Sequence, residues 1–252
     1  MGRVNNMKQT AFITYAHRGA SHYCPENTMM AFYMGMQMGA NGIETDVRRT
    51  RDGVLVLFHD ETLMRVTGAE GSIADHTYDE LQQLLVKKGT LHDKLPTLED
   101  FLAHFAYRDV TFAIELKADG IEQEVADLIF RYGIAEKAVI TAFELHRLEA
   151  IKAYAPSLRV GYLTETVDDA LINKLVAMGA AEICPHGRDV TPENVTNWHA
   201  RGLNVRAWGI SNEDIMKQVY DAGANGMTVN FPDLLLHYIS EKEHANEHAL
   251  ER

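Results

Sequence analysis

Two carboxylates and two imidazoles stand close to apolar runs in the N-terminal part of the chain. His17 follows Phe-Ile-Thr-Tyr-Ala, and His59 follows Val-Leu-Val-Leu-Phe. Between them, Glu44 and Asp46 lie two residues apart in Gly-Ile-Glu-Thr-Asp-Val. Side chains of a strand alternate between its two faces, so these carboxylates are expected to point the same way. Two neighbouring buried carboxylates repel each other, and a bound cation is the simplest partner that would stabilise them.

A third carboxylate extends this set. Glu115 and Lys117 alternate in Thr-Phe-Ala-Ile-Glu-Leu-Lys and therefore also share a strand face. Oxygen ligands from Glu44, Asp46 and Glu115 suit a hard divalent cation, Mg²⁺ or Ca²⁺. The alternative is purely structural. Glu44 and Asp46 could form ion pairs with Arg48 or Lys117, and Glu115 could pair with Lys117.

Cationic and imidazole side chains supply the rest of a reactive site. Arg18 and Lys117 are suited to a phosphate group, Arg18 by its planar fork and Lys117 as a point charge. His17 and His59 have the right intrinsic pKa to share general base and general acid duties near neutral pH. A cation, a phosphate clamp and two imidazoles together indicate a site that cleaves phosphodiesters. Arg18 has an alternative role, a salt bridge to Glu26 that anchors its loop.

Apolar, β-branched runs alternate with segments of helical period along the 252 residues. The predicted strands are 12–17, 42–48, 111–117, 138–143, 159–164, 182–186, 204–209 and 226–230. The predicted helices are 28–38 (after an Asn27 cap), 120–131, 144–154, 168–178, 192–199 and 214–221. Eight alternating strands and helices predict an α/β fold, a closed (β/α)8 TIM barrel with catalytic groups at the C-terminal strand ends. The rival is an open doubly wound sheet, which the lack of Gly-x-Gly-x-x-Gly disfavours.

Two segments depart from this alternation. Arg51-Asp52-Gly53 is a hairpin turn signal, and it should return the chain antiparallel so that His59 lies near the end of strand two. Glu61–Leu98 is a long excursion in which one helix, Tyr78–Val86, and no clear strand are predicted. Long excursions within a barrel are usually functional. We therefore expect one domain, 1–252, carrying a small cap, 61–98, at one rim.

Charge and composition exclude several classes of protein. The net charge of -12 argues against a nucleic-acid-binding surface and against stable association with anionic membranes. Met1–Thr10 is polar and lacks the apolar core of a secretory signal, and no run approaches the roughly 20 apolar residues of a membrane span. Cys24 and Cys184 match no metal or redox spacing and are interpreted as free thiols. A cytoplasmic enzyme with a small-molecule substrate is expected.

The motifs, taken in order, resemble those of the glycerophosphodiester phosphodiesterase family, in its small bacterial cytosolic form. The resemblance rests on His17-Arg18-Gly19, Pro25-Glu26-Asn27-Thr28, Ile43-Glu44-x-Asp46-Val47, Asp52-Gly53, His59-Asp60-x-x-Leu63-x-Arg65-x-Thr67, Pro96-Thr97-Leu98, Ile114-Glu115-x-Lys117, Trp208 and Gly226–Pro232. It covers nearly the whole chain. Gly209-Ile-Ser, where the family more often has Thr-Val-Asn, and Thr228-Val-Asn230, where Thr-Asp is usual, depart from the family pattern.

The resemblance implies a TIM barrel with a small insertion, and hydrolysis of glycerophosphodiesters to sn-glycerol 3-phosphate and an alcohol. It implies His17 and His59 as the catalytic pair, Glu44, Asp46 and Glu115 as metal ligands, and Arg18 and Lys117 as phosphate contacts. Trp208 is a further candidate for substrate binding. It further suggests attack by the glycerol 2-hydroxyl to give a cyclic phosphate that water opens, with direct attack by water as the alternative. A homodimer is expected from similar enzymes.

Other interpretations remain open at this point. One is a lipid phosphodiesterase such as a lysophospholipase D, for which the sequence of the 61–98 segment looks too polar. Another is a barrel that binds phosphodiesters without cleaving them. Trp208 fits core packing as well as a wall for the glycerol moiety. The remaining histidines show no partner spacing and are interpreted as surface residues: His22, His76, His92, His104, His146, His186, His199 and those of the C-terminal tail, 241–252, itself expected to be a solvated helix end.

Overall fold

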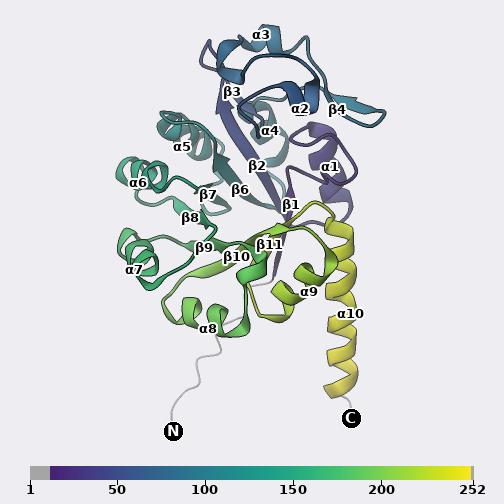
Figure 1. Ribbon diagram of the computed structural model, residues 1–252, viewed down its shortest axis with the longest axis vertical. Helices are drawn as coiled ribbons and strands as arrows, with labels where there is room; N and C mark the ends of the chain where they lie inside the picture. Colours follow the sequence, from purple (N-terminus) through teal and green to yellow (C-terminus); the bar gives the residue numbers. More distant parts are fainter. Residues whose placement is uncertain (1–11, 251–252) are drawn as a thin grey trace.

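The apolar runs form a closed barrel of eight parallel strands (Figure 1). The structure is a computed structural model that describes residues 12–250. Strands pair in the order β1-β2-β6-β7-β8-β9-β10-β11, and β11 pairs with β1, which closes the ring. They are β1 (Ile13–His17), β2 (Gly42–Arg49), β6 (Thr111–Leu116), β7 (Ala138–Ala142), β8 (Arg159–Thr164), β9 (Glu182–Pro185), β10 (Asn204–Ile210) and β11 (Gly226–Val229). The predicted (β/α)8 TIM barrel is confirmed, and the open sheet is wrong.

Helices cover the outside of this barrel and bury their apolar faces against it. They are α1 (Met29–Gln37), α4 (Leu98–Phe105), α5 (Glu122–Arg131), α6 (Leu145–Tyr154), α7 (Asp169–Met178), α8 (Pro192–Ala200), α9 (Glu213–Asp221) and α10 (Pro232–Leu250). The predicted helices lie within two residues of these bounds. Helix α4 was not predicted, although Leu98, Phe101, Leu102 and Phe105 form one buried face at helical spacing.

The cap of α1 differs from the prediction. Thr28, not Asn27, is the N-cap residue, and its Oγ1 accepts a hydrogen bond from the backbone N–H of Ala31 at 3.3 Å. The carboxamide of Asn27 instead donates to Asp46 at 2.8 Å and accepts from the hydroxyl of Thr45 at 2.8 Å. Both residue types are good caps, so sequence alone could not separate them. Asn27 therefore forms hydrogen bonds to β2 at the barrel rim instead of capping the helix.

The predicted hairpin is present. β3 (Leu55–Leu57) pairs antiparallel with the end of β2, with Val47 opposite Leu57. The turn places Gly53 at φ +90°, a left-handed conformation that glycine adopts without strain. This return carries the chain to His59 at the barrel rim and into the segment that follows it.

The insertion after the hairpin has a small core of its own, which includes Leu63, Ile73, Leu81 and Val86. Its elements are α2 (Met64–Thr67), the 3₁₀ turn η1 (Ile73–Asp75), α3 (Tyr78–Leu81), β4 (Val86–Lys88) and β5 (Leu91–Asp93). Two expectations are wrong here. The helix predicted over Tyr78–Val86 ends at Leu81, and the segment predicted to lack strands holds the antiparallel β4–β5 pair. In Figure 1 the insertion is the uppermost part of the molecule, above β3 and α1.

The barrel interior contains a buried ion pair. Arg206 on β10 is 2% exposed, and its Nε donates to Glu182 on β9 at 3.1 Å. The same guanidinium donates to Thr228 Oγ1 at 2.9 Å and to Cys184 Sγ at 3.4 Å, and it lies 5.2 Å from the ring centroid of Tyr15. Arg206 and Thr228 of this network line the same cavity as the candidate site residues.

A further 3₁₀ turn, η2 (Gly187–Asp189), follows β9. The tail predicted as a helix end belongs to α10 as far as Leu250, while Met1–Thr10 and the last two residues of the tail lie outside the described residues. No helix within residues 12–250 is both long and apolar enough to cross a membrane.

Candidate active site

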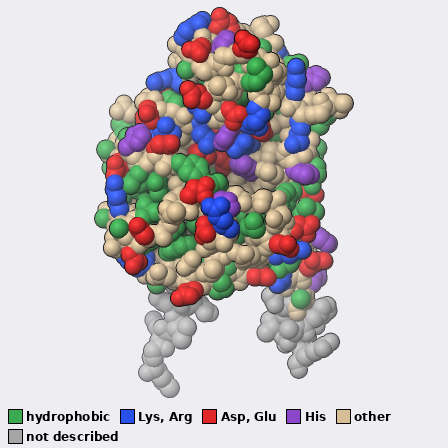
Figure 2. All heavy atoms as spheres, in the orientation of Figure 1, with side chains coloured by type: hydrophobic (Ala, Val, Ile, Leu, Met, Phe, Trp, Pro, Cys, Tyr) green, Lys and Arg blue, Asp and Glu red, His purple; other side chains and the backbone are tan. Residues whose placement is uncertain are grey.

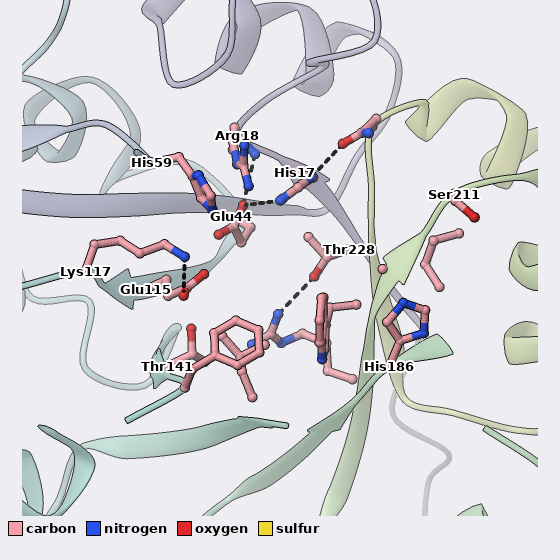
Figure 3. A pocket seen from close by; sticks show the side chains of 17 residues that line it. His17, Arg18, Glu44, His59, Glu115, Lys117, Thr141, His186, Ser211 and Thr228 are labelled. Carbon is pink, nitrogen blue, oxygen red and sulfur yellow. Dashed lines mark hydrogen bonds and ion pairs between the residues drawn. The ribbon is translucent and has the colours of Figure 1, made fainter. Parts of the chain in front are cut away.

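Strand register brings the predicted site residues together at the C-terminal end of the barrel. His17 lies opposite Glu44 across β1 and β2, and Asp46 lies opposite Glu115 across β2 and β6. The antiparallel return of β3 brings His59 to the same rim. All but the fully buried Asp46 line one cavity. Figure 3 shows the ionic and imidazole side chains gathered at one end of it: His17, Arg18, Glu44, His59, Glu115 and Lys117.

The three carboxylates form a buried cluster. Glu44, Asp46 and Glu115 are 3%, 0% and 7% exposed, and each offers an oxygen within 4.8 Å of the others. Burial, followed by the charges of Asp46 and Glu115, raises the pKa of Glu44 well above its usual range. Burial and the charge of Asp46 likewise raise the pKa of Glu115 to about 7. The cluster is thus short of positive charge.

Asp46 is the centre of this cluster. Burial alone would raise the pKa of Asp46, but the positive charges of Arg18 and Lys117 outweigh it and hold the pKa below its ordinary value. Oδ2 lies 3.1 Å from Nε of Arg18, and Oδ1 lies 3.5 Å from Nζ of Lys117. Among the described residues, Oδ1 has no hydrogen-bond partner. A buried oxygen without a hydrogen bond, in a set whose possible ligands are all carboxylates, fits a hard divalent cation.

The two cations predicted to face a phosphate contact carboxylates. Nζ of Lys117 lies 2.5 Å from Oε1 of Glu115, and Arg18 Nη1 donates to Glu26 at 2.9 Å. The two structural alternatives considered for them are therefore realised in the geometry, and both side chains also line the cavity. Arg48 does not join the cluster; its guanidinium donates to the backbone oxygen of Lys117 at 3.1 Å.

The imidazoles are each held through Nδ1. Nδ1 of His17 lies 2.5 Å from Oδ1 of Asn230, while its Nε2 lies 3.9 Å from Oε2 of Glu44. Nδ1 of His59 lies 2.6 Å from Oδ1 of Asp60. Burial lowers the pKa of both imidazoles, that of His17 to about 3. Both rings can therefore accept a proton at neutral pH, and each has Nε2 left for chemistry.

The cavity has a volume of about 370 Å³ and extends from these ionic groups to a more apolar end. Trp208 lies there, edge-to-face with Phe143 and with His186 at centroid distances of 4.9 Å. His186 is half-buried and lines the cavity, so its interpretation as a surface residue is wrong. Figure 2 shows charged and histidine side chains across the middle of this face, beneath the insertion.

Comparison with known proteins shows the family of the chain. Residues 17–234 match the profile of the Glycerophosphoryl diester phosphodiesterase family. The chain belongs to this family. A glycerophosphodiester phosphodiesterase of Caldanaerobacter subterraneus subsp. tengcongensis is 31% identical over 90% of this chain and 97% of its own length. One from Bacillus altitudinis is 32% identical over 87% of this chain and 94% of its own.

The fold is likewise that of solved family structures. An Oleispira antarctica phosphodiesterase, solved in complex with the product sn-glycerol-3-phosphate, aligns with a TM-score of 0.79. It is 24% identical, and the alignment covers 90% of this chain and 96% of that one. The prediction that this chain is an enzyme of the glycerophosphodiester phosphodiesterase family is confirmed.

The His-Arg-Gly motif of this family member has a steric basis. Arg18 adopts a left-handed backbone conformation, φ +54°, and Gly19 follows at φ +80°. A Cβ on Gly19 would lie 2.4 Å from the backbone carbonyl carbon of Ala31 in α1. The loop therefore needs glycine to pack against α1 while it points Arg18 at Asp46.

Sequence reasoning missed several residues that shape the site. Asp60 and Asn27 were quoted as parts of motifs, but their contacts to His59 and Asp46 were not foreseen. Asn230 was seen only as a departure from the family pattern. Arg206 alternates with Trp208 on β10, so its position on the strand's inner face could have been inferred from the period of two. His186 carries no such signal.

Proposed function

We propose that this chain hydrolyses glycerophosphodiesters, in a metal-dependent reaction, to sn-glycerol 3-phosphate and an alcohol. The observation that carries the proposal is one cavity lined by His17, His59, Glu44 and Glu115, with Asp46 buried beside them. Sn-glycerol-3-phosphate is the product in the Oleispira complex, and we propose the same product here.

The residues that would hold the divalent cation, Mg²⁺ or Ca²⁺, are Glu44, Asp46 and Glu115. When bound, such an ion supplies positive charge that stabilises the negative charge developing on the phosphate and lowers the pKa of a coordinated hydroxyl. Its carboxylate ligands must be deprotonated, which the raised pKa of Glu44 opposes unless the ion is present.

His17 is proposed as the general base. Its Nε2 removes the proton of the glycerol 2-hydroxyl, whose oxygen forms a bond to phosphorus while the bond from phosphorus to the leaving alcohol breaks. His59 is proposed as the general acid that gives a proton to that alcohol; its Nδ1 lies 2.6 Å from Oδ1 of Asp60, whose negative charge opposes the burial that lowers the pKa of the ring. A water molecule then opens the cyclic phosphate with the two imidazoles in exchanged roles.

The remaining side chains bind substrate. Lys117 and Arg18 are held by carboxylates on one side, and their remaining N–H groups would donate to phosphate oxygens. Trp208 is fixed by a hydrogen bond from its Nε1 to the backbone oxygen of Thr164 at 3.3 Å. It would form an apolar wall for the carbon atoms of the substrate.

The test is a panel of glycerophosphodiesters, with glycerophosphocholine, glycerophosphoethanolamine and a lysophospholipid, assayed for released glycerol 3-phosphate with Mg²⁺, Ca²⁺ or a chelator. Turnover of the first two, abolished by chelator, is expected. Release of free alcohol from the lysophospholipid alone would favour a lipid phosphodiesterase, and binding without turnover would favour a non-catalytic barrel.

Variants sharpen this test. His17→Ala and His59→Ala are each expected to lower kcat about 10²–10⁴-fold, the usual contribution of a general acid or base. His92→Ala, which removes an exposed imidazole on β5, is the matched control and should leave turnover unchanged. Substantial turnover by His17→Ala would refute the assigned roles.

We also propose the organisation expected from the sequence: one domain with residues 61–98 as a cap, acting in the cytoplasm as a homodimer. The support is the resemblance to the small cytosolic family members. Light scattering of the purified protein tests the dimer, since a mass near 28.3 kDa would identify a monomer instead.

A further inference from the structure

Asn230 joins the end of β11 to the start of α10 and contacts the loop that follows β1. Its Oδ1 lies 2.5 Å from Nδ1 of His17 and accepts a hydrogen bond from Oγ of Ser21 at 2.9 Å. Its backbone oxygen accepts from the N–H of His22 at 3.0 Å. One contact to the end of β1 and two to the loop after it fix Asn230 relative to the imidazole.

The identity of the contacting atom decides the tautomer. A carboxamide oxygen accepts hydrogen bonds and cannot donate them, so the short contact requires the proton on Nδ1 of His17. A neutral imidazole carries one N–H, which leaves Nε2 as a lone-pair acceptor. That nitrogen is 3.9 Å from Oε2 of Glu44, and both residues line the cavity. Figure 3 shows the ring between these two contacts.

Ser21 strengthens this arrangement. An amide oxygen has two acceptor sites, and the hydroxyl of Ser21 occupies one while His17 occupies the other. The group that orients His17 is the neutral carboxamide of Asn230, whereas the one that orients His59 is the carboxylate of Asp60. The amide orients the ring without adding negative charge beside the acidic cluster.

We propose that Asn230, supported by Ser21, is a positioning residue that holds His17 in the Nδ1–H tautomer with Nε2 free to take the substrate proton. The proposal rests on the proposed function for its catalytic consequence. The tautomer itself is a property of the protein alone, so it can be tested without turnover.

The first measurement is ¹⁵N NMR of protein labelled at histidine, with the His17 signals identified by their loss in His17→Gln. In the wild type, His17 is expected to show a protonated Nδ1 and an unprotonated Nε2 at neutral pH. Asn230→Leu, similar in size but without an acceptor, should give a mixture of tautomers. Asn230→Asp keeps an acceptor oxygen and should keep the Nδ1–H form. A protonated Nε2 in the wild type would overturn the proposal.

The second measurement is kinetic. Asn230→Leu should lower kcat about tenfold or more, part of the roughly 10²–10⁴-fold available to a general base, with KM changed little. Asn230→Asp should recover most of that loss, and Ser21→Ala should have a smaller effect of the same sign. If Asn230→Leu fails to fold, Ser21→Ala and Asn230→Asp still test the positioning role. A correct tautomer in a protein without activity would count against the proposed function and not against the positioning role. Full kcat in folded Asn230→Leu would refute that role.

Discussion

Arg65 donates two hydrogen bonds to Glu26, one to each carboxylate oxygen, both at 2.7 Å. The same guanidinium donates to both oxygens of Asp60, at 2.6 and 2.9 Å. Glu26 in turn accepts from Arg18, and Asp60 contacts His59. One side chain of the insertion is thereby linked to a phosphate-binding candidate and to a catalytic candidate. The insertion is therefore connected to both candidates, through one carboxylate in each case.

Arg65→Met is expected to lower kcat/KM about 10²-fold, because a displacement of about 1 Å at the reacting groups can cost that much. Arg65→Lys should recover little, since an ammonium cannot bind two carboxylates through paired N–H groups. Steady-state kinetics and a melting curve for each variant make the measurement.

Arg51→Met is the matched control for Arg65. Arg51 also belongs to an ion pair of this region, with Glu80 at 3.0 Å, but both side chains are about half exposed. Surface pairs contribute little, so its removal should change kcat/KM less than twofold. Equal effects of the two substitutions would mean that the insertion acts through general stability instead of through Glu26 and Asp60.

The contribution of this network to the folding stability should be lost at acid pH. Hydrogen bonds from Arg65, and then the contact with His59, lower the pKa of Asp60 from its ordinary 3.8 to about 2. A carboxylate with a lowered folded-state pKa stabilises the protein above its unfolded-state pKa, and this contribution is lost as pH falls through the folded-state value. The destabilisation by Asp60→Asn should therefore be full at pH 6 and shrink between about pH 4 and pH 2.

Urea unfolding of the wild type and of Asp60→Asn across this pH range measures the difference. Glu136→Gln, which changes an exposed carboxylate outside the network, gives the background pH dependence. A destabilisation by Asp60→Asn that stays constant down to pH 2 would show that the carboxylate charge is not what Arg65 stabilises.

Sequence could predict the parts of this molecule in which a local pattern determines the structure. The barrel strands are apolar runs buried on both faces, and the period of two placed Glu44 with Asp46 and Glu115 with Lys117. The pairing of Asp46 with Glu115 across neighbouring strands follows from the barrel itself. The fold and the candidate metal ligands could therefore be predicted from the sequence.

The parts that could not be predicted depend on tertiary contacts. Residues 86–93 form a hairpin in which only Val86 is buried, so no apolar period marks β4 and β5. His186 has the same type as many exposed histidines and differs only in its contact with Trp208. Asn230 is far from His17 in sequence, and only the closure of β11 onto β1 brings them together.

Metal binding should stabilise the wild type far more than Glu44→Gln. Without metal, burial and the neighbouring carboxylates make the charge on Glu44 unfavourable, so the neutral amide is expected to raise the free energy of unfolding or leave it unchanged. With Mg²⁺ or Ca²⁺ at 100 times its Kd, the wild type should gain about 2.7 kcal/mol, and Glu44→Gln should gain far less.

Thermal unfolding with chelator and with a metal series tests this prediction, and isothermal calorimetry gives Kd. Glu61→Gln, at an exposed glutamate of the insertion, is the control and should respond to metal as the wild type does. Equal metal-induced stabilisation of the wild type and Glu44→Gln would place the ion elsewhere.

The buried pair beneath the site gives a last prediction, about stability. Arg206→Met removes the cation from Glu182, which is 3% exposed, and should destabilise the barrel by about 3–5 kcal/mol, because an uncompensated charge stays buried. Arg206→Met combined with Glu182→Leu removes both charges and should recover most of that loss. Arg159 lies 3.8 Å from the other oxygen of Glu182. Its positive charge limits the destabilisation expected from Arg206→Met alone. Urea unfolding of the wild type, both single variants and the double variant gives the coupling energy, and strictly additive losses would mean that Arg206 stabilises the barrel through packing and not through Glu182.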